Sequence, residues 1–261
     1  MNDQPQPESS DGCDGINRPT RFIAISVFAI VTGVFTTVYF YKSMCCDMEM
    51  PGGWTMSMMW MQMPGQSWFT SSLSFLVMWL AMMAAMMMPS ALPMFLKTRR
   101  QWTSLCYMAA GYFTIWLVSG IGIYSLGISI AKETMRSEQF SRIIPLLLGI
   151  WLIAGGVIQF TKWKMKHLLR CRSSFGCAVS CPQLNTSYHI GCKQGIECCL
   201  CCIAPMTIQL AVGVMNPLVM IAVAIFITAE KLLPRPEITT RLVGFAALFA
   251  GFMTIIRGDF L

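Results

Sequence analysis

The sequence predicts an all-α fold: a polytopic helical membrane bundle of about six transmembrane helices, with both termini in the cytoplasm. The chain is 55% hydrophobic and only 12% charged, whereas soluble domains carry about 25% charged residues. Apolar runs recur at about the 20 residues that cross a bilayer. The predicted spans are 22–41, 73–96, 104–130, 143–160, 203–229 and 242–256, the last of which is short. Sulfur is concentrated between these spans, in one methionine-rich and one cysteine-rich stretch.

A polar tail of residues 1–21 precedes one helical membrane domain, residues 22–261. The tail is long and acidic and no small-residue cleavage site follows the first apolar run, so we do not expect a cleavable signal. Cytoplasmic segments of membrane proteins are enriched in Lys and Arg. With six spans and a cytoplasmic N-terminus, the predicted inner segments hold twelve of the 19 basic residues. We therefore expect the loop 42–72 outside and the segment 162–202 inside.

The predicted outer loop is rich in methionine, and fifteen of the 23 methionines fall between Met44 and Met94. Eight of them precede Leu73 and stand among Gly, Pro, Ser, Gln and acidic residues, where there is little apolar core to fill. Thioether sulfur is a soft ligand that favours Cu(I). The second span continues the pattern on two sides of a helix, with Met78, Met82 and Met86 on one and Met83, Met87 and Met94 on the other. In that span, packing of irregular apolar space is an equally weighted alternative.

The predicted inner segment carries eight of the twelve cysteines, from Cys171 onward. They do not form the two cleanly separated Cys-x-x-Cys pairs of a structural zinc site, and no thioredoxin-like βαβ pattern surrounds them. His167 and Cys171 are four residues apart and would share a helix face, as would Cys198, Cys202 and Met206. Soft ligands on successive turns fit a soft metal. Packing of small cysteines at a helix interface is the alternative.

The candidate metal ligands are all sulfur atoms except for one imidazole. They are Met56, Met58, Met59, Met61, Met63, Met82, Met83, Met86, Met87, Met94, His167, Cys171, Cys198, Cys201, Cys202 and Met206. Together they predict Cu(I) as the cargo, with zinc as the second choice. The net charge of +7 follows from basic loops beside the lipid bilayer, and no basic stripe with interleaved aromatics indicates nucleic acid.

Four sequence blocks between residues 68 and 256 resemble a bacterial family of predicted metal-binding integral membrane proteins. They are Met82-Met83-x-Ala85-Met86-Met87-x-Pro89-Ser90-x-x-Pro93-Met94, Thr161-x-x-Lys164 leading to Cys171-Arg172, Gly195-x-x-Cys198-x-x-Cys201-Cys202 with Met206, and Gly213-Val214-Met215-Asn216 before Glu230-Lys231-Leu232-x-Pro234. The family pattern usually has Cys at His167, His at Arg170 and Trp at Ile203. The resemblance implies copper, because some members are membrane copper chaperones that serve tyrosinases.

The leading hypothesis is therefore a non-enzymatic copper chaperone in the bacterial cytoplasmic membrane, which delivers Cu(I) to a cuproenzyme such as a tyrosinase. A copper transporter or exporter is the second hypothesis. It would lack an ATPase motor, because the sequence has no Gly-x-x-x-x-Gly-Lys-Ser/Thr motif. A membrane thiol oxidoreductase that uses the adjacent cysteines is the third, and a structural subunit whose sulfur only packs is the fourth.

Overall fold

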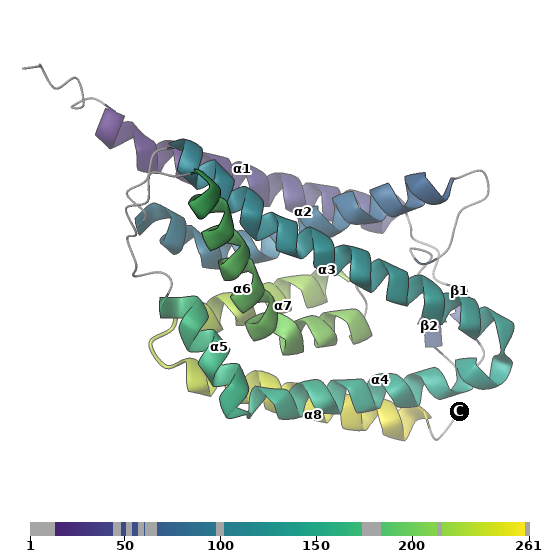
Figure 1. Cartoon of the computed structure of the whole chain (residues 1–261). Helices are drawn as coiled ribbons and strands as arrows, with labels where there is room; N and C mark the ends of the chain where they lie inside the picture. Colours follow the sequence, from purple (N-terminus) through teal and green to yellow (C-terminus); the bar gives the residue numbers. More distant parts are fainter. Residues whose placement is uncertain are drawn as a thin grey trace, which may run out of the picture.

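The computed structural model describes residues 14–43, 48–50, 54–56, 60, 67–97, 102–173, 184–212 and 216–258. Within these ranges the chain forms eight α-helices and one antiparallel pair of three-residue strands, so the predicted all-α bundle is confirmed (Figure 1). The elements are α1 (Asp14–Ser43), β1 (Met48–Met50), β2 (Trp54–Met56), α2 (Trp68–Lys97), α3 (Trp102–Arg136), α4 (Glu138–Gln159), α5 (Lys162–Ser173), α6 (Leu184–Val212), α7 (Pro217–Leu232) and α8 (Pro236–Gly258).

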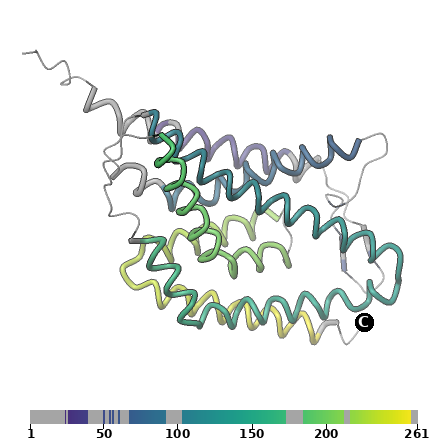
Figure 2. The backbone as a smooth tube through the Cα atoms, viewed as in Figure 1, coloured from purple at the N-terminus to yellow at the C-terminus, as the bar shows by residue number. Residues whose placement is uncertain are grey.

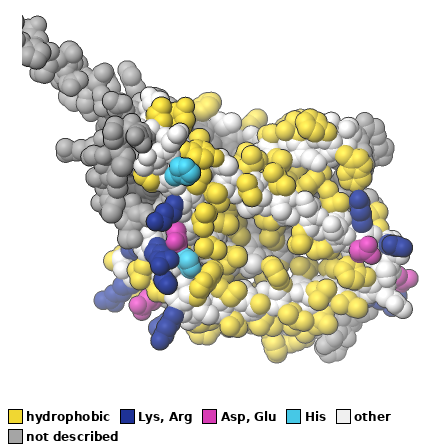
Figure 3. Space-filling model, in the orientation of Figure 1, with side chains coloured by type: hydrophobic (Ala, Val, Ile, Leu, Met, Phe, Trp, Pro, Cys, Tyr) yellow, Lys and Arg dark blue, Asp and Glu magenta, His cyan; other side chains and the backbone are white. Residues whose placement is uncertain are grey.

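Five described helices are long and apolar enough to cross a membrane, namely α2, α3, α4, α6 and α8. In α1 the described apolar stretch is shorter, Ser26–Tyr39. The space-filling view shows a wide hydrophobic band, with charged side chains gathered at its two ends (Figure 3). Large side chains such as Phe28 and Leu218 are more than 70% exposed on this surface. Such a surface is suited to lipid and not to water, so the protein is a membrane protein.

Close helix contacts depend on glycine at a few positions. A Cβ on Gly191 of α6 would overlap the backbone carbonyl of Met108 in α3. A Cβ on Gly251 of α8 would lie 2.8 Å from the carbonyl oxygen of Gly149 in α4. Small residues that let backbones approach are the usual basis of helix packing in membranes. They bring α3 against α6 and α4 against α8, which the backbone tube also shows (Figure 2).

The predicted span 203–229 is wrong, because two helices divide it. α6 begins at Leu184, ends at Val212 and is followed by α7, which begins at Pro217. Asn216 caps α7, since its side-chain oxygen accepts hydrogen bonds from the backbone N–H groups of Leu218 and Val219. The end of α7 returns to the middle of α6, where Lys231 contacts Cys198. The two helices therefore form a hairpin inside the bundle (Figure 1), and the cysteines lie within a span and not at its boundary.

This hairpin changes the expected position of the C-terminal end. Because α6 and α7 enter and leave at the same end of the bundle, α8 runs away from that end and finishes at the opposite end from the start of α1 (Figure 1). The first described turn of α1 and the last turn of α8 therefore lie at opposite ends of the bundle, whereas the sequence had led us to expect the two termini on one side. The junction between α7 and α8, which includes Arg235, lies at the end where α1 starts, and the last turn of α8 lies at the other end (Figure 1).

The small β-hairpin lies where α3 ends and α4 begins (Figure 1). Met50 and Met56 are buried there against Ala131 of α3. The Trp54 indole N–H donates to the carbonyl oxygen of Ser141 at 3.0 Å. Pro145 lacks the N–H that would normally bond the carbonyl four residues earlier, so this carbonyl is open to an outside donor. The proline in α4 therefore helps to hold the methionine-bearing hairpin in place.

Candidate metal site

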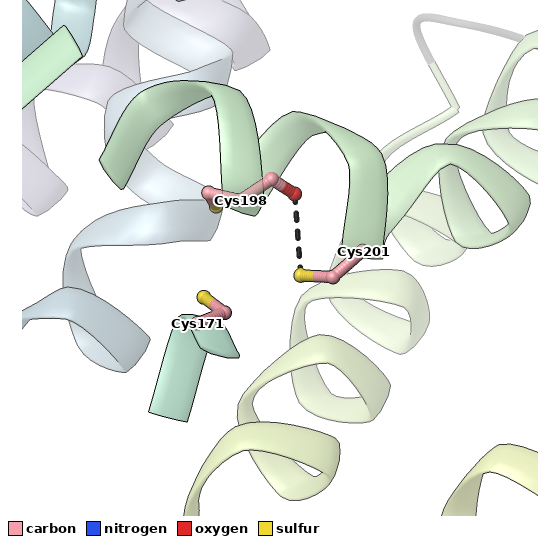
Figure 4. Close-up of side chains that lie close together, drawn as sticks. All are labelled: Cys171, Cys198 and Cys201. Carbon is pink, nitrogen blue, oxygen red and sulfur yellow. Dashed lines mark hydrogen bonds between the residues drawn. The ribbon is translucent and has the colours of Figure 1, made fainter. Parts of the chain in front are cut away.

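Three thiols from two helices meet inside the bundle. The Sγ atoms of Cys171, Cys198 and Cys201 all lie within 4.8 Å of one another, and each side chain is about 1% exposed. Cys198 and Cys201 stand on consecutive turns of α6, and Cys171 faces them from α5 (Figure 4). All three are free thiols. Residues three apart on a helix share a face, so the sequence spacing alone places two of the three.

The third thiol depends on how α5 is held. Lys164, Leu168 and Cys171 recur at helical spacing and are all buried, so they form the inner face of α5. The Lys164 ammonium pairs with Glu230 Oε2 at 2.8 Å and also donates to the carbonyl oxygen of Cys201. Pro205 has no N–H for that carbonyl, which explains why it is available. The pair thus ties α5 to both α6 and α7 beside the thiols.

Two more contacts fix the same helix. The Arg172 guanidinium donates to the carbonyl oxygen of Glu230 at 2.9 Å. The Gln194 amide N–H lies 3.3 Å from the carbonyl oxygen of Cys171 and 3.6 Å from its sulfur. Cys171 is therefore held in place by polar side chains from α5 and α6, as a ligand position requires.

A buried cation completes the site. Lys231 Nζ lies 3.0 Å from Cys198 Sγ, 3.3 Å from Ser90 Oγ and 4.0 Å from Met87 Sδ. Its side chain is 5% exposed. Within the described part of the chain no carboxylate pairs with Lys231, whereas Lys164 has Glu230. The positive charge of Lys231 therefore faces the thiols directly, at hydrogen-bond distance from Cys198.

Cys198 is the centre of this network. Its sulfur lies 3.0 Å from the hydroxyl of Tyr112 and 4.0 Å from the thioether of Met87. Cys202 Sγ lies 3.6 Å from Cys201 Sγ, so a fourth thiol borders the trio. The site thus offers three thiols in mutual reach, a fourth beside them and one thioether. This donor set is entirely sulfur, which favours Cu(I) over harder cations.

The Cys171 thiol is protonated at neutral pH in the metal-free protein. Its hydrogen bond with Cys198, together with burial, raises the pKa of the Cys171 thiol to about 12. A thiol must lose its proton to ligate a metal, and the metal itself drives that loss. Binding at this position is therefore coupled to proton release.

The structure brings some of the predicted ligands together and leaves others apart. The four described candidates of α2, Met82, Met83, Met86 and Met87, are at most 1% exposed and belong to the core that contains the thiols. Met206 is buried in the same core. Met56 is 4% exposed in the β-hairpin core, although the sequence predicted little core for it. Outside what the structure describes lie Met58, Met59, Met61 and Met63 and the side chain of Met94.

His167 does not join the trio of thiols. Its Nδ1 lies 2.6 Å from Glu197 Oε2, and its ring packs edge-on against Trp163. The spacing of His167 and Cys171 had predicted a shared metal, but among the described residues the group of close metal-binding atoms contains only cysteines. The imidazole of His167 instead serves as a partner of Glu197 on the next helix.

Sequence reasoning missed Lys231, Tyr112 and Ser90. Lys231 stands two residues after the predicted span 203–229, and the hairpin places its side chain inside the bundle, against Cys198. Ser90 and Lys231 stand inside the quoted sequence blocks, Ser90 directly after Pro89 and Lys231 directly after Glu230, and that position was the available signal. Tyr112 gave no such signal in the sequence, because an aromatic residue in an apolar helix is common.

The fold and the candidate site together define a helical membrane protein with a buried cluster of thiols that has the geometry to hold a metal. A family model described as PpoB2, copper chaperone, matches residues 76–254, which is more than half of the chain. The chain therefore belongs to the PpoB2 copper chaperone family. No curated protein and no solved structure matches the chain.

Proposed function

We propose that this protein is a copper carrier of the bacterial cytoplasmic membrane that binds Cu(I) at Cys171, Cys198 and Cys201 and hands it to a cuproenzyme. The observation that carries the proposal is the meeting of these three thiols with the Met87 thioether. Copper handling agrees with the family of the chain. The resemblance to chaperones that serve tyrosinases supports a tyrosinase-like recipient. The protein's part is transfer without catalysis.

The balance of charges around the thiols supports Cu(I) binding at this buried position. A Cu(I) ion held by two thiolates carries one net negative charge, and an uncompensated buried charge is strongly unfavourable. Lys231 supplies one positive charge 3.0 Å from Cys198 Sγ. The pair Lys164–Glu230 is neutral in itself. With two of the three cysteines bound as thiolates and the third kept as a neutral thiol, the loaded site is therefore electrically neutral, and copper can reside inside the membrane domain.

The arrangement of the sulfur atoms also supports transfer. Cys202 lies beside the trio at 3.6 Å from Cys201, so a copper ion can exchange one thiolate for another without leaving sulfur coordination. Zinc is a weaker second candidate, because structural zinc sites use four Cys or His ligands in a tetrahedron and a thioether is a poor zinc ligand.

The test is metallation of a partner. A bacterial tyrosinase is co-expressed with the full chain at limiting copper, and tyrosinase activity is measured together with the amount of this protein in the membrane. We expect the double variant Cys198→Ser/Cys201→Ser to accumulate and to lose metallation. Cys199→Ser is the matched control, because Cys199 stands between them on α6 but outside the trio. Full metallation by the double variant at limiting copper would contradict the proposal.

A further inference from the structure

A row of buried methionines leads away from the thiols along α2. Met78, Met82, Met83, Met86 and Met87 fall within ten residues, and each is at most 1% exposed. All five belong to the same core as Cys171, Cys198 and Cys201. Residues four apart on a helix are separated by about 6 Å along its axis. Successive thioethers on one flank are therefore one turn apart, a distance that flexible methionine side chains bridge in part.

This row of methionines has the thiols at one end and a group of aromatic rings at the other. At one end, Met87 Sδ lies 4.0 Å from Cys198 Sγ. At the other end stands an aromatic group in which Phe75 lies between Trp60 and Tyr124, with ring centroids 5.6 Å and 4.8 Å away. Trp60 packs both against the core that holds Met78 and against the pair Met50 and Met56. Thioethers thus occur on both sides of Trp60.

The β-hairpin and the thiols also belong to different parts of the membrane domain. The hairpin lies at the end where α3 passes into α4, and the thiols lie toward the end where α5 crosses the bundle (Figure 1). From Met78 to Met87 the row advances about 14 Å along α2, roughly half the thickness of a bilayer's hydrocarbon core. Core packing alone requires only apolar bulk, which Leu supplies with better-defined rotamers.

We propose that the α2 methionines form a conduit that carries Cu(I) from the Met50–Met56 hairpin to the thiols, so that the protein moves copper through the membrane domain. The proposal rests on the copper site described above and adds a direction and a route. Copper enters and leaves each thioether as Cu(I), so no electron is transferred, and thioethers carry no proton to displace. Thiolates bind the ion more tightly than neutral thioethers. Net movement therefore runs from the hairpin toward Cys198.

The test uses purified full-length protein in proteoliposomes that enclose a fluorescent Cu(I) chelator. Cu(I) is supplied outside under reducing conditions, and the rate of chelator response is recorded. We expect wild-type protein to deliver copper and Met82→Leu/Met86→Leu to deliver it at least about tenfold more slowly. Met-to-Leu changes preserve volume and typically cost less than about 1.5 kcal/mol. The protein inserts into the vesicles in both orientations, which reduces the amplitude of the chelator signal equally for every variant.

Met108→Leu is the matched control, because Met108 is 2% exposed but lies in a separate core cluster with Ala91 and Leu105. Equilibrium Cu(I) binding in detergent is measured for each variant, and the single variants are used if the double one does not fold. The conduit alone is overturned if wild-type protein binds Cu(I) in detergent but does not deliver it to the chelator. It is also overturned if the double variant delivers Cu(I) at the wild-type rate. Absence of Cu(I) binding by wild-type protein in detergent overturns the copper site itself.

Discussion

Replacing Lys231 by Met should weaken Cu(I) binding about a hundredfold. The change keeps an unbranched side chain of similar length and removes the one positive charge that faces Cys198 Sγ at 3.0 Å. At an effective dielectric constant of about 20, two unit charges at that distance attract by about 5 kcal/mol. Removing one partner of a buried ion pair costs about 3–5 kcal/mol in practice.

The lower part of that range applies here, because the negative charge of a copper bis-thiolate is spread over two sulfurs and the metal. About 3 kcal/mol corresponds to roughly a hundredfold in the dissociation constant.

The assay is competition with a Cu(I) chelator of known affinity, in detergent and under anaerobic, reducing conditions. Lys231→Arg retains the charge and should lose less affinity than Lys231→Met. Lys132→Met is the matched control, because Lys132 lies over the ring of exposed Trp68, away from the thiols. An affinity that changes less than about threefold in Lys231→Met, or that rises, would refute charge compensation by this residue.

Three further results are expected. Gly191→Leu should lower the thermal stability in detergent, because its Cβ would overlap the Met108 carbonyl and overpacking costs about 1–3 kcal/mol. Gly122→Leu is the control and should leave the stability unchanged, since nothing lies within 4 Å of a Cβ there. Equal losses of stability in the two variants would contradict this packing. Because the pKa of the Cys171 thiol is raised to about 12, the apparent Cu(I) affinity should rise with pH across the neutral range, about tenfold per unit for each proton displaced; a flat profile in chelator competition would show that no proton leaves. In a variant without native cysteines, an impermeant thiol reagent should reach cysteines placed at Gly258 and at Asp14 from opposite sides of the membrane, whereas labelling of both from one side would contradict the α6–α7 hairpin.

The sequence predicted the helical class because apolar runs of bilayer length mark helices, which is a local rule. For α6 it grouped Cys198 with Cys202 and Met206 on one face, whereas in the structure Cys198 and Cys201 come within reach of Cys171. The third thiol, Cys171, was also a candidate, but its partner could not be inferred locally. It was assigned to His167, four residues away, whereas tertiary packing of α5 brings it to α6.

The position of Lys231 shows the main limit of sequence reasoning. Residues 203–229 are almost continuously apolar, so length and hydropathy favour a single crossing. Asn216 and Pro217 mark the break, but only the packing of α7 against α6 shows that the chain turns back there. Lys231, which stands two residues after this apolar run, consequently lies against a buried thiol. The same reversal moved the C-terminal end of α8 to the opposite end of the bundle.

X-ray absorption at the copper edge, on full-length protein loaded with one Cu(I), tests the central claim most directly. We expect a Cu(I) ion whose nearest neighbours are all sulfur, in wild-type protein and in Cys199→Ser. We expect the double variant Cys198→Ser/Cys201→Ser to lose that ion under the same chelator wash. Nitrogen or oxygen neighbours in wild-type protein, or an unchanged sulfur-bound copper in the double variant, would contradict it.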